Sequence, residues 1–100
     1  MIFPPAASKT PTTGSWKEPE LWGPRAVAVD SHGNVFVADT GASVVKVMTP
    51  DLRPALVIGD DGPLAARLSR PVDCVIDEDG LLYVCDPGAG QVVVYRLVYP

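Results

Sequence analysis

The chain has 100 residues, a formal net charge of −4 at pH 7, and 47% hydrophobic against 20% charged residues. This composition is typical of one small globular domain and excludes a disordered, collagen-like or coiled-coil chain. The eight basic residues are scattered, which disfavours nucleic acid as a partner, and neither a signal peptide nor an apolar run of about 20 residues is present. We therefore expect a cytoplasmic protein with no membrane partner.

Residues 1–20 form an N-terminal segment that precedes the first strand pattern. Its prolines interrupt any ladder of backbone amides, so at best it supplies an edge strand to this chain or to a neighbouring one. Trp16 and Trp22 flank an acidic run, and exposed aromatic residues are frequent anchors in interfaces. Both are interface candidates; packing against the first strands is the alternative, and for Trp22 we favour it.

Residues 21–67 are predicted to form a four-stranded antiparallel unit. Short β-branched runs predict its strands, and clusters of Asp and Gly separate them. Asp30 and Gly33 close the first hairpin, where glycine supplies a positive φ, while Asp39 and Gly41 close the second, where glycine again relaxes the backbone. The expected strands are residues 27–29, 35–38, 44–48 and 55–58.

The same pattern returns in residues 68–100. Residues 21–53 align without a gap on residues 68–100, at an offset of 47. The equivalent turns hold Asp77 with Gly80 and Asp86 with Gly88. This second unit stops just after its third strand, so we expect it to lack an outer strand of its own, and an unpaired edge attracts a partner strand.

The strands are nearly continuously apolar, without a clean alternation of polar and apolar residues. This pattern favours sheets that are covered on both faces, as the blades of a β-propeller are. The fold class predicted is therefore all-β, with two four-stranded propeller blades.

The motif that runs from Pro24 through Ala26-Val27-Ala28-Val29-Asp30 to Gly33-Asn34-Val35-Phe36-Val37-Ala38-Asp39-Thr40-Gly41 closely resembles the NHL repeat. The second copy departs from it at Cys74, Cys85 and Pro87. The resemblance implies a β-propeller, usually of six blades, that contacts protein or RNA, or in some relatives performs lactonase or lyase chemistry.

Two blades leave two apolar faces bare, because repeat units bury their faces only against neighbours. Either the chain belongs to a longer parent, or copies associate head to tail until a ring closes. Three copies would give six blades, so a homotrimer is the form of self-association we expect.

The carboxylates Asp30, Asp39, Asp77 and Asp86 recur in register, which suits either hard-oxygen cation ligands or turn caps. We interpret them as turn caps. His32 is the only histidine and falls in a hairpin turn, so one chain offers neither a Ser-His-Asp triad nor a multi-histidine zinc site. We predict no catalytic, cofactor-binding or metal-binding residue.

Cys74 and Cys85 lie on adjacent predicted strands. We expect buried, reduced thiols, with a cross-strand disulfide as the alternative that depends on the hairpin register. Lys46 and Arg96, on third strands, are expected to point to solvent. The function predicted is a non-enzymatic scaffold for protein interaction or self-assembly; the alternative is a fragment of a propeller hydrolase or lyase whose active site needs more blades.

Overall fold

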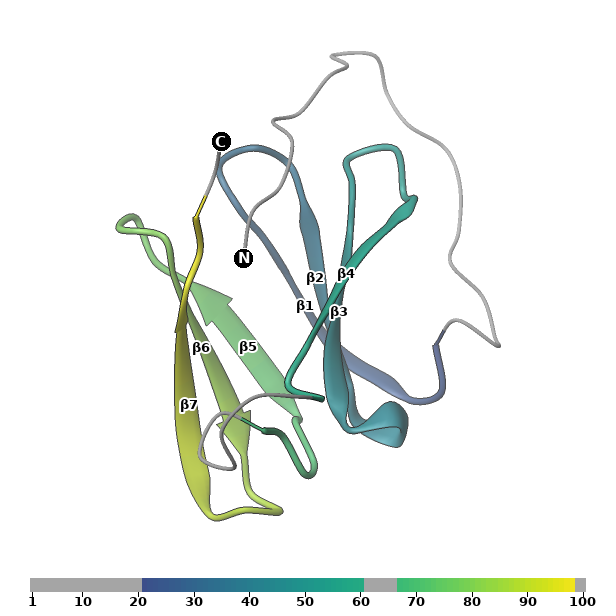
Figure 1. Ribbon diagram of the computed structural model, residues 1–100, viewed down its shortest axis with the longest axis vertical. Coiled ribbons are helices and arrows are strands. Elements are labelled where there is room, and N and C mark those ends of the chain that lie inside the picture. Colours follow the sequence, from purple (N-terminus) through teal and green to yellow (C-terminus); the bar gives the residue numbers. More distant parts are fainter. Residues whose placement is uncertain (1–20, 61–66, 99–100) are drawn as a thin grey trace.

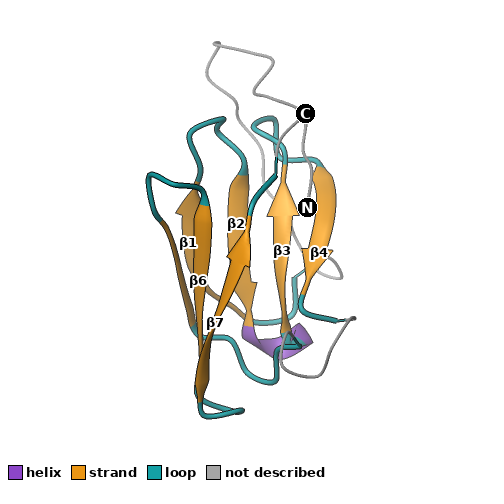
Figure 2. Ribbon diagram, turned by 60° about the vertical axis from the view of Figure 1, so that its left-hand side comes forward, coloured by secondary structure: helices purple, strands orange, loops and turns teal. Residues whose placement is uncertain are grey.

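The computed structural model describes residues 21–60 and 67–98 and shows two antiparallel β-sheets (Figures 1 and 2). In each sheet the strands follow one another in chain order, so every strand pairs with its neighbour in the sequence. Sheet 1 consists of β1 (Pro24–Val29), β2 (Val35–Asp39), β3 (Val44–Met48) and β4 (Pro54–Ile58), and sheet 2 of β5 (Asp73–Ile76), β6 (Leu81–Asp86) and β7 (Gln91–Arg96).

The all-β prediction is confirmed, with a single short 3-10 turn, Thr40–Ala42, in the described part of the chain. Sheet 1 has the four strands expected of it, whereas sheet 2 has three in the residues described. The expected edge strand from residues 1–20 falls outside the described residues.

The two sheets pack face to face, and β5 lies against β1 and β2 (Figure 1). Along each strand, side chains that enter the layer between the sheets alternate with side chains that point away from it, because successive side chains of a strand lie on opposite faces. Sheet 1 buries Phe36 and Ala38 completely, and sheet 2 buries Leu82 and Val84 completely. The core of the molecule is therefore the layer between the sheets.

Each sheet has a front and a back face, which we define by the repeat. The front face comprises Ala26, Ala28, Phe36, Ala38, Val45 and Val47 in sheet 1, and the equivalent Asp73, Val75, Tyr83, Cys85, Val92 and Val94 in sheet 2. The back face comprises Val27, Val29, Val35, Val37, Lys46 and Met48 in sheet 1, and the equivalent Cys74, Ile76, Leu82, Val84, Val93 and Tyr95 in sheet 2.

The core is made of the front face of sheet 1 and the back face of sheet 2. The sheets therefore stack front to back, with the two repeats in the same sense. The front face of sheet 2 takes no part in this core, and neither does the β1 part of the back face of sheet 1. These surfaces are bare within one chain, as expected for two blades without further neighbours.

Candidate interaction surface

Asp39 ties the start of sheet 1 to the end of β2. Its fully buried carboxylate accepts hydrogen bonds from the backbone amides of Trp22 at 3.0 Å and Gly23 at 2.8 Å, and from that of Ala42 at 3.3 Å. The Lys46 ammonium lies 3.1 Å away. Burial raises the pKa of Asp39, but the amides and Lys46 outweigh it and hold the pKa below its ordinary value.

Lys46 does not point to solvent as expected, because only 13% of its side chain is exposed. Lys46 pairs with Val37 across β2 and β3, which makes Asp39 its diagonal neighbour on the back face. The register thus brings the ammonium within reach of the buried carboxylate. Arg96 is exposed, at the end of β7.

Asp86 makes the equivalent connection in sheet 2. Its buried carboxylate accepts from the backbone amides of Ser69 at 2.9 Å and Arg70 at 2.7 Å. Val93 stands at the position equivalent to Lys46. The second repeat therefore stabilises its buried carboxylate with amide donors and without a lysine at this position. In both sheets the carboxylate holds the entering chain against the end of the second strand.

Asp30 and Asp77 organise the first hairpin of each sheet. Asp30 Oδ1 accepts from the amides of His32 and Asn34, both at 2.9 Å, and Asp77 Oδ1 accepts from those of Asp79 and Leu81, both at 2.9 Å. These are the Asx-type bonds by which aspartate shapes a turn.

The glycines of these hairpins supply the left-handed residue. Gly33 has a φ of 83° and Gly80 a φ of 77°. A residue with a Cβ atom is strained at such angles, which explains why both repeats place glycine here.

Gly41 and Gly88 act differently from the expected relaxation of the backbone. A Cβ atom at Gly41 would lie 2.9 Å from the Trp22 carbonyl carbon, and one at Gly88 would lie 2.7 Å from the Arg70 Cβ. Both glycines therefore permit close contact between the turn and the entering chain. The left-handed residue of the first of these turns is Ser43, with a φ of 61°.

The two tryptophan candidates have different outcomes. Trp22 is 65% exposed, so the favoured expectation that it packs against the first strands is wrong. Its backbone amide is held by Asp39, which leaves the indole at the surface. Trp16 lies outside the described residues.

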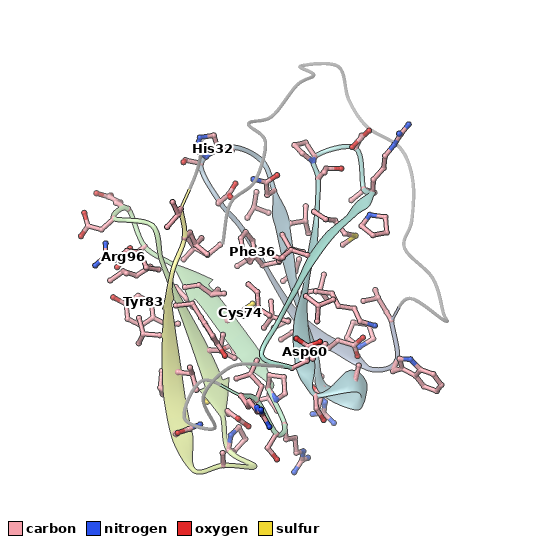
Figure 3. All side chains as sticks on the ribbon, in the orientation of Figure 1. His32, Phe36, Asp60, Cys74, Tyr83 and Arg96 are labelled. Atoms are coloured by element: carbon pink, nitrogen blue, oxygen red, sulfur yellow. The ribbon has the colours of Figure 1, made fainter. Side chains whose placement is uncertain are left out.

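The two cysteines are free and lie on opposite faces of sheet 2. Cys74 pairs with Val84, and Cys85 with Asp73, so the register excludes a disulfide between them. The Cys74 thiol is buried between the sheets, 3.9 Å from the Phe36 carbonyl oxygen (Figure 3), and burial raises its pKa to about 11. Cys85 is exposed, contrary to the expectation of two buried thiols.

His32 and the acidic hairpins line a hollow between the two sheets. Asp30 and His32 contribute from sheet 1, and Asp77, Glu78 and Asp79 from sheet 2. The carboxylates of Asp30 and Asp77 are already occupied by backbone amides. Among residues 21–60 and 67–98, no three His, Cys, Asp or Glu side chains are grouped so as to hold a metal ion.

The front face of sheet 2 is one of the bare apolar faces expected of two blades without further neighbours. Three valines on it are half exposed or more: Val75 at 57%, Val92 at 60% and Val94 at 50%. Val75, Tyr83 and Val94 form one row across the three strands. Tyr83 lies on the side of sheet 2 away from Phe36 and Cys74 (Figure 3), and its hydroxyl donates to Asp77 at 2.8 Å.

Exposed apolar patches with polar rims are typical of interaction sites. The repeat contained the signal that identifies this row. Val75 and Val94 are equivalent to Ala28 and Val47, which lie on the packed face of sheet 1.

No protein-family model matches the chain. The chain is 36% identical over 75 residues to the E3 ubiquitin-protein ligase NHLRC1 of Rattus norvegicus. The aligned region covers 73% of this chain and 18% of that protein. Among the described residues, no helix has the length and apolar character needed to cross a membrane.

Proposed function

We propose that the chain is a pair of NHL-type β-propeller blades that serves as a non-enzymatic protein-interaction module. The observation that carries the proposal is the exposed front face of sheet 2, with Val75, Val92 and Val94 on one side of the same sheet. Contact with another surface removes such valines from water, and this burial lowers the free energy of the system.

Two further observations support the NHL assignment. The motif from Pro24 to Gly41 resembles the NHL repeat, and the similarity to NHLRC1 points to the same family. The front-to-back packing of two antiparallel sheets is also the arrangement that propeller blades require. The complete propeller has six blades, supplied by three copies of this chain or by a longer parent.

The test compares two variants that add the same charge at different places. Val94→Lys places an ammonium in the middle of the front face of sheet 2, while Ala89→Lys places one on an exposed turn. The immobilised proteins are incubated with cell extract and with the free chain, and the retained proteins are quantified by mass spectrometry. Unchanged thermal melting verifies that each variant is folded.

We expect Val94→Lys to reduce retention by at least about tenfold, because the partner must then bury a charge, and Ala89→Lys to leave it unchanged. Equal retention by the two variants, or no protein retained by the unmodified chain, would refute the proposal.

A further inference from the structure

We propose that the partner of the front face of sheet 2 is β1 of a second copy of this chain, stacked in the same front-to-back sense as the two sheets within one chain. This inference rests on the proposed function, since it names the occupant of the same face. The internal contact between the sheets provides the template.

In that internal contact, β5 is the strand of sheet 2 that lies against β1 and β2. Cys74 of β5 is the clearest marker, because its thiol reaches the Phe36 carbonyl oxygen at 3.9 Å and also meets the backbone of Ala38. The front face of sheet 1 thus receives the first strand of the next sheet. The first strand of sheet 1 is β1, and the repeat makes it equivalent to β5.

The exposed surfaces are the ones that this arrangement needs. On the back face of sheet 1, Val27 of β1 is 62% exposed and Val29 is 59% exposed, while Val37 of β2 is buried. On the front face of sheet 2, Val75 and Cys85 are exposed on β5 and β6. Each chain therefore exposes β1 on the back face of sheet 1, and β5 and β6 on the front face of sheet 2.

Charge supports the match between these surfaces. Ala26 in β1 and Val72, which directly precedes β5, are both uncharged. Their repeat equivalents at the bare surfaces are Asp73 on the front face of sheet 2 and Arg25 on β1, both exposed. An uncharged combination is thus replaced by two opposite charges, one on each surface, which attract when one copy stacks on another.

Side-chain size also matches. Within the chain, Ala28 of the front face and Ile76 of the back face contribute to the packed layer. At the bare surfaces the equivalent residues are Val75 and Val29. Val75 is larger than its equivalent Ala28, and Val29 is smaller than its equivalent Ile76. The two changes offset each other, so the two bare surfaces together fill a similar volume, as close packing requires.

The stacked arrangement predicts a specific disulfide. Since Cys74 contacts the strand that holds Phe36 and Ala38, its equivalent Val27 must contact the strand that holds Tyr83 and Cys85 of the next copy. In Val27→Cys, mild oxidation should link position 27 of one chain to Cys85 of another. Val57→Cys is the matched control, because Val57 is also exposed on sheet 1 but belongs to β4.

We expect Val27→Cys to give at least about tenfold more disulfide-linked oligomer than Val57→Cys, with the 27–85 peptide pair identified by mass spectrometry. A Cys85–Cys85 link in the unmodified chain as the main product would overturn the inference, since it requires two front faces to meet. Equal linkage in the two variants, or none in Val27→Cys, would overturn it as well.

A charge exchange gives a second readout on surface residues that do not enter the core. Asp73→Arg should weaken self-association, measured by sedimentation, about tenfold, and Arg25→Asp combined with Asp73→Arg should restore it. Arg53→Asp, in an exposed turn, is the control and should change nothing. If the exchange restores nothing while Val94→Lys still abolishes retention of another protein, the copy is not the partner and the proposed function stands.

Discussion

Replacing Asp39 by Asn tests whether the buried carboxylate holds the entry of sheet 1. The substitution keeps the shape of the side chain but turns one acceptor into a donor that faces backbone amides. It also removes the charge 3.1 Å from the Lys46 ammonium. Hydrogen bonds to a charged group contribute about 1.5–3 kcal/mol each, and breaking a buried pair costs about 3–5 kcal/mol. We expect Asp39→Asn to lower the free energy of unfolding by about 3 kcal/mol.

The assay is urea unfolding followed by circular dichroism. With a slope of about 1.5 kcal/mol per molar urea, the midpoint should fall by about 2 M. Asp86→Asn should cost less, about 2 kcal/mol, because that carboxylate has two amide donors and Val93 in place of the lysine.

A double-mutant cycle isolates the contribution of Lys46. Lys46→Val copies the solution of the second repeat and should cost about 1 kcal/mol alone. In the Asp39→Asn background the same change should cost nothing or stabilise, since the ammonium has already lost its carboxylate. The coupling energy should exceed about 1 kcal/mol; additivity within about 0.5 kcal/mol would refute the reasoning.

Three further predictions follow from the same geometry. The pKa of Asp39 is held below its ordinary value of 3.8 in the folded protein. The contribution of Asp39 to the free energy of unfolding is therefore complete above pH 3.8 and is lost as the pH falls through the lower pKa of the folded state. The urea midpoint should fall steeply in that pH range, and less steeply in Asp39→Asn. Gly41→Ala should lower the free energy of unfolding by about 2–3 kcal/mol, because the new Cβ atom would lie 2.9 Å from atoms of Trp22. Gly90→Ala, with a φ of 66° and open space around it, should cost only about 1 kcal/mol, and equal losses would contradict the contact argument. In dilute native protein, a thiol reagent at pH 8 should modify Cys85 and spare Cys74, whose pKa is about 11, until urea is added; two thiols modified in the native state would contradict the burial of Cys74.

The positions of the strands could be predicted because β-branched runs end at Asp and Gly, residues whose backbone preferences are local. Gly33 and Gly80 have the positive φ angles expected of them for the same reason. Local chemistry of this kind depends on few neighbours and is therefore readable from a sequence.

The burial of individual strand residues could not be predicted, because it depends on which face of each sheet meets another sheet. Val75 and Val84 are both valines of sheet 2, yet Val75 is 57% exposed and Val84 fully buried, because only the back face of that sheet meets sheet 1. An apolar run does not say which of its faces has a neighbour. The pairing of Lys46 with Asp39 was recoverable, since the strand register makes them diagonal neighbours.

The order of the strands has a consequence for how the protein is made. Because each strand pairs with the one before it in the sequence, sheet 1 has all its partners as soon as residues 21–60 have been synthesised. Such local pairing keeps the loops to be closed short, which favours rapid formation. Phe36 and Ala38, however, remain exposed to solvent until β5 has been synthesised. The growing chain therefore passes through a stage in which sheet 1 is complete but its front face is still exposed to solvent.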